Sequence, residues 1–212
     1  MPKRSIYDLN VKDKRLFVRV DFNVPLIAGQ ISDDTRIRSA LPTLQYALEQ
    51  GASLVLASHL GRPKGERRRE FSLKPISIRL SELLGQPVTF ATDCVGPDAL
   101  QAIEHSGQNG VTLLENLRFH KEEEANDPVF SASLASLADC YVNDAFGSAH
   151  RAHASTTGIV PHVTDAATGL LLARELKYLG ALLDNPTRPF TAILGGSKVS
   201  GKLEVIKNLL PR

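Results

Sequence analysis

Arginine, histidine and small polar side chains follow four apolar runs of this sequence, each at the point where the run ends. The runs and the segments after them are RLFVRV (15–20) with DFNVP, SLVLAS (53–58) with HLGRPKG, VTLLE (111–115) with NLRFH, and CYVND (140–144) with AFGSAHRAH. The arginine guanidinium is a rigid fork of donors that matches phosphate and carboxylate oxygens in pairs. The pattern therefore indicates a site for a small, multiply charged anion. The candidates are Asp21, Asn23, His59, Arg62, Arg118, His150, Arg151 and His153, and TRIR (35–38) adds Arg36.

Each of these residues, taken alone, also has an ordinary explanation. A single arginine at the end of a strand is usually solvated or in a surface ion pair, and a single histidine is more often structural than functional. Three of the four segments carry an arginine, however, and this coincidence favours one shared site. A histidine beside a bound phosphate would be biased toward its protonated form, because a nearby anion favours the imidazolium. Asp21 and Asn23 would accept a hydrogen bond from a substrate hydroxyl.

The apolar runs are predicted to be strands. They are short, rich in Val, Leu, Ile, Phe or Thr, and have turn residues nearby. Helical patterns separate them, and this alternation favours an α/β fold, a parallel sheet with helices on both faces. Ligands of such folds bind beyond the carboxyl ends of the strands, where the candidate residues fall. The expected strands are 15–20, 53–58, 87–91, 111–115, 140–144 and 190–196, and the expected helices lie within 37–48, 74–85, 96–107, 127–138 and 167–189.

Local sequence signals refine these elements. Pro42 lies inside the first helical pattern, where it predicts either a kink or a new first turn after a short loop. Gly85 ends the second pattern and is expected to cap that helix. Two charge runs, GERRRE (65–70) and HKEEEAND (120–127), are interpreted as solvated surface.

The composition is that of an ordinary globular protein of 212 residues, with 42% hydrophobic and 23% charged residues. A net charge of +2 gives no strong field toward nucleic acid or a membrane, and we expect neither as a partner. The N-terminus has no signal-peptide pattern and no apolar stretch could cross a membrane, so we expect a cytoplasmic protein. Cys94 and Cys140 are too few for a disulfide framework or a cysteine-based metal site; we expect free thiols and no metal.

The segment GSKVSGKL (196–203) has the Gly, four residues, Gly, Lys spacing of a P-loop, which cradles nucleotide phosphates. Leu203 stands where a P-loop carries the hydroxyl that holds magnesium, and this counts against a P-loop NTPase. A weaker interpretation remains, because Lys198 and Lys202 are four residues apart and would share one helical face. Two lysines near a helix N-terminus attract phosphate.

Five motifs together resemble the phosphoglycerate kinase family: RVDFNVP, SHLGRPKG, LLENLRFHKEEE, YVNDAFGSAHRAHAS and LGGSKVSGK. They occur in family order and cover nearly the whole chain. The resemblance implies two similar-sized α/β lobes, a Rossmann-like N-terminal lobe that binds 3-phosphoglycerate and a C-terminal lobe that binds Mg-ATP or Mg-ADP. It implies the glycolytic, reversible phosphoryl transfer between ATP and 3-phosphoglycerate that gives 1,3-bisphosphoglycerate and ADP. We expect a monomer.

The resemblance also implies roles for individual residues. Arg36 resembles the family's catalytic arginine, Lys198 the lysine that stabilises the migrating phosphoryl group, and Lys202 a contact of the nucleotide phosphates. The magnesium-binding acidic motif of the family is not found in this chain. The predicted substrate-binding residues are Asp21, Asn23, Arg36, His59, Arg62, Arg118 and Arg151, and Arg19, His150 and His153 belong to the same basic patch.

Two features depart from the family pattern. Gly201 stands where the family usually carries an acidic residue, and the glycine-rich nucleotide loops are missing. We therefore expect a substrate-binding lobe at 1–170, an interdomain helix and hinge at 171–189, and the first strand and helix of a truncated second lobe at 190–212.

Three functional hypotheses remain open on this sequence. The first is a phosphoglycerate kinase fragment with negligible turnover alone, and the second is a non-catalytic phosphometabolite-binding module. The third, a P-loop NTPase, would bind ATP tightly without binding phosphoglycerate.

Overall fold

The computed structural model describes residues 4–184, 188–193, 195 and 200–209. The chain divides into two compact units, Met1–Ala173 and Arg174–Arg212, which are described separately.

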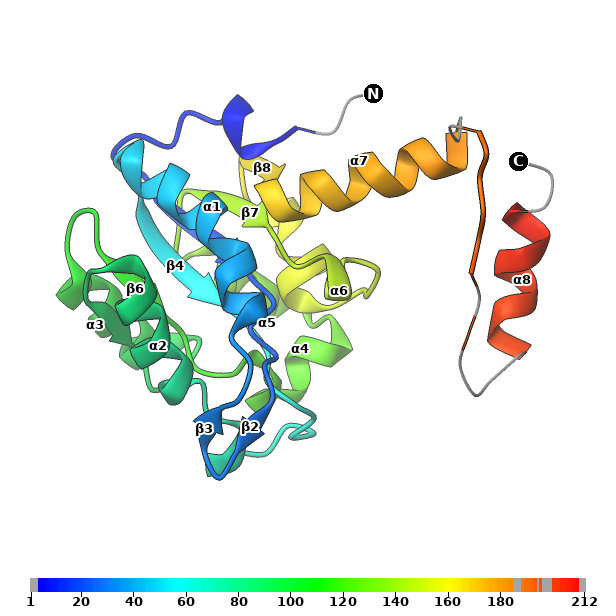
Figure 1. The fold of residues 1–212 in the computed structure, drawn as a ribbon. Coiled ribbons are helices and arrows are strands. Elements are labelled where there is room, and N and C mark those ends of the chain that lie inside the picture. Colours follow the sequence, from blue (N-terminus) through cyan, green and yellow to red (C-terminus); the bar gives the residue numbers. More distant parts are fainter. Residues whose placement is uncertain (1–3, 185–187, 194, 196–199, 210–212) are drawn as a thin grey trace. The chain divides into compact units, whose positions relative to one another are not determined.

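The first unit is built on one parallel sheet, shown in Figure 1. Its strands lie in the order β5-β6-β4-β1-β7-β8, and each neighbouring pair is parallel. The predicted α/β class is therefore confirmed. The strands are β1 (Arg15–Arg19), β4 (Ser53–Ala57), β5 (Val88–Phe90), β6 (Val111–Leu113), β7 (Cys140–Asn143) and β8 (Asp165–Thr168).

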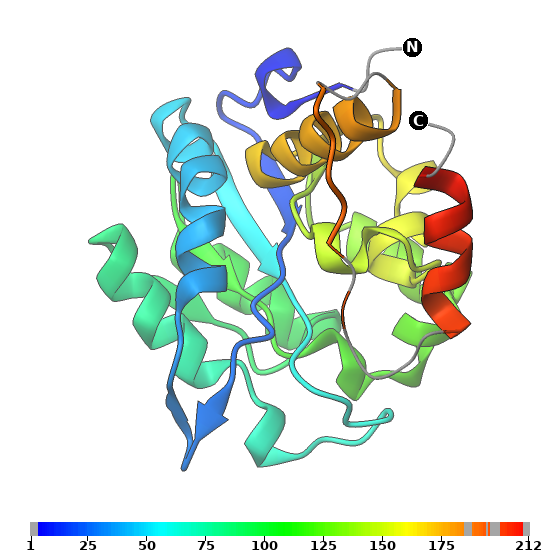
Figure 2. The ribbon, with the colours of Figure 1, turned by 45° about the vertical axis from the view of Figure 1, so that its right-hand side comes forward.

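Helices cover both faces of this sheet because its strands are apolar on both sides. Leu16 and Val18 of β1 point into one core, whereas Phe17 points into the other. The first core includes buried side chains of α1 (Thr35–Glu49) and α2 (Lys74–Leu84), and the second includes those of α3 (Gly96–Ser106) and α5 (Pro128–Ala135). Figure 2 turns the ribbon so that the helices flanking the sheet can be followed.

Short elements connect these layers. The hairpin consists of β2 (Leu26–Ile27) and β3 (Gln30–Ile31), and the longer connections contain single helical turns. These turns are η1 (Ile6–Asp8), η2 (Arg69–Phe71), η3 (Leu117–Phe119), α4 (Lys121–Ala125), α6 (Phe146–Ala149), η4 (Ala154–Gly158) and η5 (Val160–His162).

Two local predictions have clear outcomes. Helix α1 runs continuously through Pro42, so no new helix begins there. Gly85 caps α2 in the left-handed conformation, with φ of 70°, and its N–H donates to the Ser81 carbonyl, as its position predicted.

Two strand pairings were not predicted from the sequence. Strand β8 pairs with β7 although its residues, DAAT, lack the apolar and β-branched character of a typical strand. The β2–β3 hairpin turns at Ala28 and Gly29, which both have positive φ, and Ala-Gly is a weaker turn signal than Asn-Gly. Both pairings depend on a neighbouring strand more than on local propensity.

The second unit holds the rest of α7 (Leu170–Asp184), which crosses the division between the units, and α8 (Ser200–Leu209). The strand predicted at 190–196 is wrong for its described residues, since 190–193 and 195 are not in a strand. A strand needs a partner for its backbone hydrogen bonds, and the described residues of this unit contain no other strand. The predicted domain boundaries at 170 and 189 stay predictions. Among the described residues, no helix is long and apolar enough to cross a membrane.

Candidate functional site

Four neighbouring strands deliver the candidate residues to one edge of the sheet. The strands β6, β4, β1 and β7 are adjacent and parallel, so their carboxyl ends open on the same edge. Strands β4, β5 and β6 all lie on one side of β1, and the chain then crosses to β7 on its other side. Such a reversal is where open α/β sheets place their ligand crevice.

A cavity of about 240 Å³ lies at this edge. All seven residues predicted to bind the substrate line it, and three further residues complete the lining. The predicted residues are Asp21, Asn23, Arg36, His59, Arg62, Arg118 and Arg151, and the additional ones are Gly61, Gly147 and Ser148. The additional residues belong to the same two post-strand segments, HLGRPKG and AFGSAHRAH, but small side chains gave no chemical signal by themselves.

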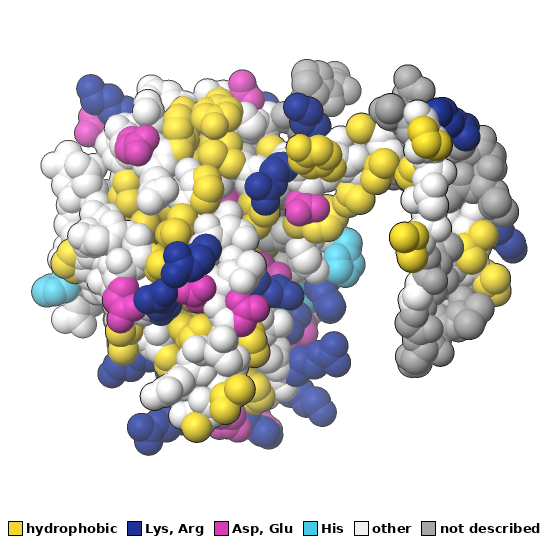
Figure 3. Space-filling model, in the orientation of Figure 1, with side chains coloured by type: hydrophobic (Ala, Val, Ile, Leu, Met, Phe, Trp, Pro, Cys, Tyr) yellow, Lys and Arg dark blue, Asp and Glu magenta, His cyan; other side chains and the backbone are white. Residues whose placement is uncertain are grey.

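Positive charge dominates the lining, with four arginines and one carboxylate. The guanidinium groups of Arg62 and Arg151 have no ion pair within the described part of the chain. Arg36 pairs with Asp21, with Nη1 2.5 Å from Oδ2. Figure 3 shows Lys and Arg side chains gathered along the side of the first unit that carries α4 and α6. The unpaired arginines favour an anion in the cavity.

The segments after β1 and β4 are bonded to each other. The N–H of Phe22 donates to Ser58 Oγ at 2.8 Å, and the N–H of Gly61 donates to Asn23 Oδ1 at 2.9 Å. Gly61 has φ of 61°, and a Cβ there would overlap the ring of Phe71. The chain can therefore turn toward the cavity at this position only because the residue is glycine.

The segment after β6 is hydrogen-bonded to the segment after β4. The Asn116 side chain donates to the carbonyls of Leu60 and Phe71 at 2.8 and 2.9 Å, and its Oδ1 accepts from the N–H of Arg118. Arg118 then donates through Nη1 to the Gly61 carbonyl at 2.9 Å. Arg118 is 5% exposed, and burial lowers its pKa from the ordinary value. Its guanidinium is therefore held in one place by the backbone of the neighbouring segment.

A buried polar network lies behind the cavity, and it corrects one prediction. Glu123 of the run HKEEEAND is fully buried rather than solvated. Its two oxygens accept from Ser155, from Oγ at 2.6 Å and from the backbone N–H at 2.9 Å. Ser155 Oγ in turn accepts from Nε of Arg19 at 2.9 Å. A buried carboxylate is stable only with such partners, and they come from segments distant in the sequence.

Arg19 links this network to His59. Arg19 is fully buried, and its Nη2 lies 3.2 Å from Nδ1 of His59. A guanidinium has donors only, so Nδ1 must accept and the ring proton sits on Nε2. Burial lowers the pKa of His59 to about 2, with further contributions from Arg19, Arg118 and Arg151. In the free protein His59 is therefore neutral and offers a donor at Nε2. The bias toward the protonated form beside a bound anion stays a prediction.

The remaining predicted residues lie outside the cavity lining. Arg19 and His153 are buried behind it, and burial lowers the pKa of His153, while His150 is exposed. Lys198 lies outside the described residues. Lys202 falls within α8, but its side chain is outside the described part of the chain.

Comparison with known proteins identifies the family. The profile of the family described as phosphoglycerate kinase matches residues 6–212. The chain belongs to the phosphoglycerate kinase family. It is 60% identical over 210 residues to the phosphoglycerate kinase of Solibacter usitatus, covering 97% of this chain and 53% of that protein. It is 56% identical over 212 residues to that of Moorella thermoacetica, covering 100% of this chain and 54% of that protein.

Solved structures agree with this assignment. Phosphoglycerate kinase from Coxiella burnetii matches with a TM-score of 0.87 at 40% identity, over 100% of this chain and 53% of that one. The enzyme from Pyrococcus horikoshii matches with a TM-score of 0.87 at 33% identity, over 98% of this chain and 52% of that one. The chain thus spans about half the length of the phosphoglycerate kinases it matches.

Proposed function

We propose that this chain supplies the 3-phosphoglycerate site of a phosphoglycerate kinase, which transfers a phosphoryl group reversibly between ATP and the substrate carboxylate. The observation that carries the proposal is the convergence of Arg36, Arg62, Arg118 and Arg151 on one cavity at the carboxyl edge of the sheet. Four guanidinium groups suit a small ligand with a phosphate at one end and a carboxylate at the other.

The lining divides naturally between these two ends. Arg62 and Arg151, which lack ion pairs among the described residues, are proposed to grip the phosphate together with Arg118 and the Nε2 proton of His59. Arg36 is proposed to contact the substrate carboxylate and the transferring phosphoryl group, and Asp21 and Asn23 to accept from the substrate hydroxyl. Catalysis of this kind depends on positioning and positive charge rather than on a general base, because a carboxylate is already a nucleophile.

The nucleotide side of the reaction is assigned to Lys198 and Lys202, with Mg-ATP or Mg-ADP as in the family. The side chains of both lysines lie outside the described part of the chain. We propose that the 212-residue chain binds 3-phosphoglycerate but turns over negligibly by itself. A non-catalytic phosphometabolite-binding module remains the alternative function.

Titration calorimetry of the purified chain with 3-phosphoglycerate tests the proposal. We expect saturable binding that Arg151→Ala and Arg62→Ala each weaken at least about tenfold, since a charge-assisted hydrogen bond contributes about 1.5–3 kcal/mol. Arg69→Ala is the matched control, because Arg69 is also exposed but does not line the cavity. Failure of 3-phosphoglycerate to bind, or equal weakening by all three variants, would contradict the proposed site.

Turnover is tested separately with a coupled assay of ADP formation. Family-like rates from the chain alone would overturn the proposal of negligible activity while leaving the binding site intact. Tight ATP binding without 3-phosphoglycerate binding would instead favour a P-loop NTPase.

A further inference from the structure

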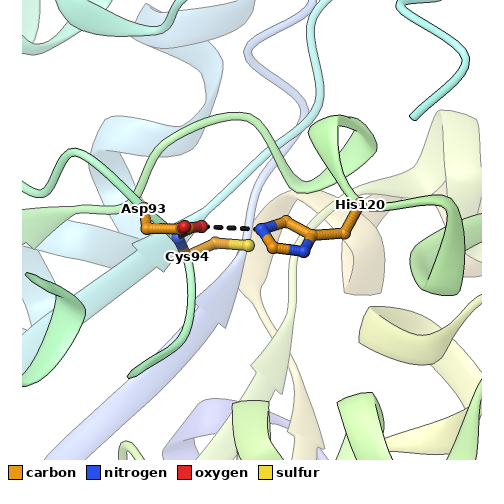
Figure 4. A group of neighbouring side chains, drawn as sticks. All are labelled: Asp93, Cys94 and His120. Carbon is orange, nitrogen blue, oxygen red and sulfur yellow. Dashed lines mark hydrogen bonds and ion pairs between the residues drawn. The ribbon is translucent and has the colours of Figure 1, made fainter. Parts of the chain in front are cut away.

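A second group of chemically reactive side chains lies outside the cavity. Asp93 and Cys94 follow strand β5, and His120 lies at the start of α4, so two separate segments bring them together. One ligand atom from each residue lies within 4.8 Å of the other two. None of the three lines the substrate cavity. Figure 4 shows the three side chains converging, with the Cys94 sulfur beside the imidazole ring and the Asp93 carboxylate.

The three side chains are held in place by other contacts. Nε2 of His120 lies 2.7 Å from Oδ1 of Asp93, and the His120 ring stacks on Phe130 with the ring centroids 5.1 Å apart. The same Asp93 oxygen accepts from the backbone N–H of Cys94 at 2.7 Å. Cys94 is fully buried below them. These contacts hold the three side chains near one another, and a bound metal would take the place of the hydrogen bond between His120 and Asp93.

A cation already approaches this group from the solvent side. Nη2 of Arg67 lies 2.5 Å from Oδ2 of Asp93, and Nη1 donates to the Thr92 carbonyl at 2.8 Å. The Arg67 side chain is 53% exposed, so it can leave the carboxylate without unfolding the loop. The position beside Asp93 therefore favours positive charge.

We propose that Asp93, Cys94 and His120 form a binding site for a zinc-class divalent cation such as Zn²⁺ or Co²⁺. Carboxylate oxygen, thiolate sulfur and imidazole nitrogen are the donors that zinc uses, with bonds of about 2.0–2.3 Å. A soft sulfur ligand disfavours Mg²⁺ and Ca²⁺, which prefer oxygen donors. Asp93 and His120 are each 26% exposed, so water can reach these two side chains.

Binding requires a defined movement of protons. The Cys94 thiol gives up its proton to solvent as the metal–sulfur bond forms. His120 donates its Nε2 proton to Asp93 in the free protein, so this proton must pass to solvent, with the ring proton then held on Nδ1, before Nε2 can bind the metal. Burial, with the nearby Asp93 charge, raises the pKa of Cys94 well above its ordinary value, so the thiol is neutral before a metal binds. The proposal departs from the expectation of no metal site, which considered the two cysteines alone and not His120 on a different segment.

The competing interpretation is that Arg67, Asp93 and His120 form a polar cluster whose only role is to stabilise the loop after β5. The two interpretations differ in what they predict for Arg67. If the cluster is only structural, Arg67→Ala removes the ion pair with Asp93 and does not change the affinity for metal. If it is a metal site, Arg67 repels the incoming cation, and Arg67→Ala tightens metal binding by about tenfold, since a like charge a few ångströms away opposes the binding of a cation.

The test titrates Co²⁺ into the full 212-residue chain after chelator treatment. We expect the near-ultraviolet absorption of a thiolate–cobalt bond, together with visible bands of four-coordinate Co²⁺, and loss of both on adding Zn²⁺. Cys94→Ser should abolish the thiolate band, whereas Cys140→Ser, the matched control at the other buried cysteine, should retain it. Arg67→Ala should reach saturation at lower Co²⁺.

A second measurement keeps the test valid if Cys94→Ser fails to fold. Zn²⁺ should raise the melting temperature of the unaltered chain and of His105→Gln, an exposed histidine on α3, but not that of His120→Gln. The proposal is overturned if excess Co²⁺ gives no thiolate band in either the unaltered chain or Arg67→Ala. It is also overturned if His120→Gln keeps the full Zn²⁺-dependent rise in melting temperature.

Discussion

Arg19 and His59 meet in the interior behind the cavity, with Nη2 of the arginine 3.2 Å from Nδ1 of the histidine. Both side chains are buried, and the contact fixes the histidine as a neutral donor that points its Nε2 proton away from Arg19. Positive charge in the cavity therefore comes from the arginines. His59 contributes a directed hydrogen bond whose strength does not depend on pH near neutrality.

Acid should reveal the lowered pKa of His59 as a loss of stability. The folded protein keeps His59 neutral down to a pKa of about 2, whereas the unfolded chain binds a proton below about 6.5. The unfolded state thus binds more protons between these values, so the free energy of unfolding falls as the pH is lowered through this window. The contribution is at most about 1.4 kcal/mol per pH unit. Urea unfolding of His59→Gln between pH 6.5 and 4 should show a correspondingly shallower slope, while His105→Gln should match the unaltered chain.

Glu123→Gln should destabilise the protein although it keeps the shape of the side chain. One carboxylate oxygen becomes an NH₂ group that faces a donor of Ser155, either Oγ or the backbone N–H. An unsatisfied buried donor costs about 1–3 kcal/mol, and Arg19 also loses the negative charge to which Ser155 links it. Thermal unfolding measures the effect, with Glu104→Gln as the exposed control. Equal melting temperatures for the two variants would show that the buried network contributes nothing.

Gly61→Ala should cost more than an ordinary glycine substitution at positive φ. Gly61 and Gly85 have φ of 61° and 70°, but a Cβ overlaps Phe71 at the first position and meets open space at the second. Gly85→Ala should therefore cost about 1 kcal/mol, the backbone term alone. Gly61→Ala should cost clearly more and should also weaken 3-phosphoglycerate binding, because Asn23 and Arg118 both bond to the Gly61 backbone. If denaturant unfolding gave similar losses in the free energy of unfolding for the two variants, the overlap with Phe71 would contribute nothing.

The sequence predicted most of the sheet and, from the segments that follow its strands, six of the residues that line the cavity, because these depend on local patterns. Short apolar runs mark strands, and parallel strands bring whatever follows them to one edge. It did not predict β8, whose DAAT segment becomes a strand only beside β7. It also placed Glu123 on the surface, since neither Ser155 nor Arg19 is near it in the sequence. Long-range contacts of this kind carry no local signal.

Asp21→Asn should separate a general anion site from a specific substrate site. Asp21 is the carboxylate in the cavity lining and pairs with Arg36, so its removal leaves that guanidinium free. Inorganic phosphate should then bind about fivefold more tightly, a gain near 1 kcal/mol because Arg36 is half exposed and its pair is screened by solvent. Binding of 3-phosphoglycerate should instead weaken, because the charged acceptor for its hydroxyl is lost. Calorimetry with both ligands measures the two effects, and Asp98→Asn, on α3 outside the cavity, controls for net charge. If both ligands gained equally, Asp21 would act only through its charge, and its proposed contact with the hydroxyl would be wrong.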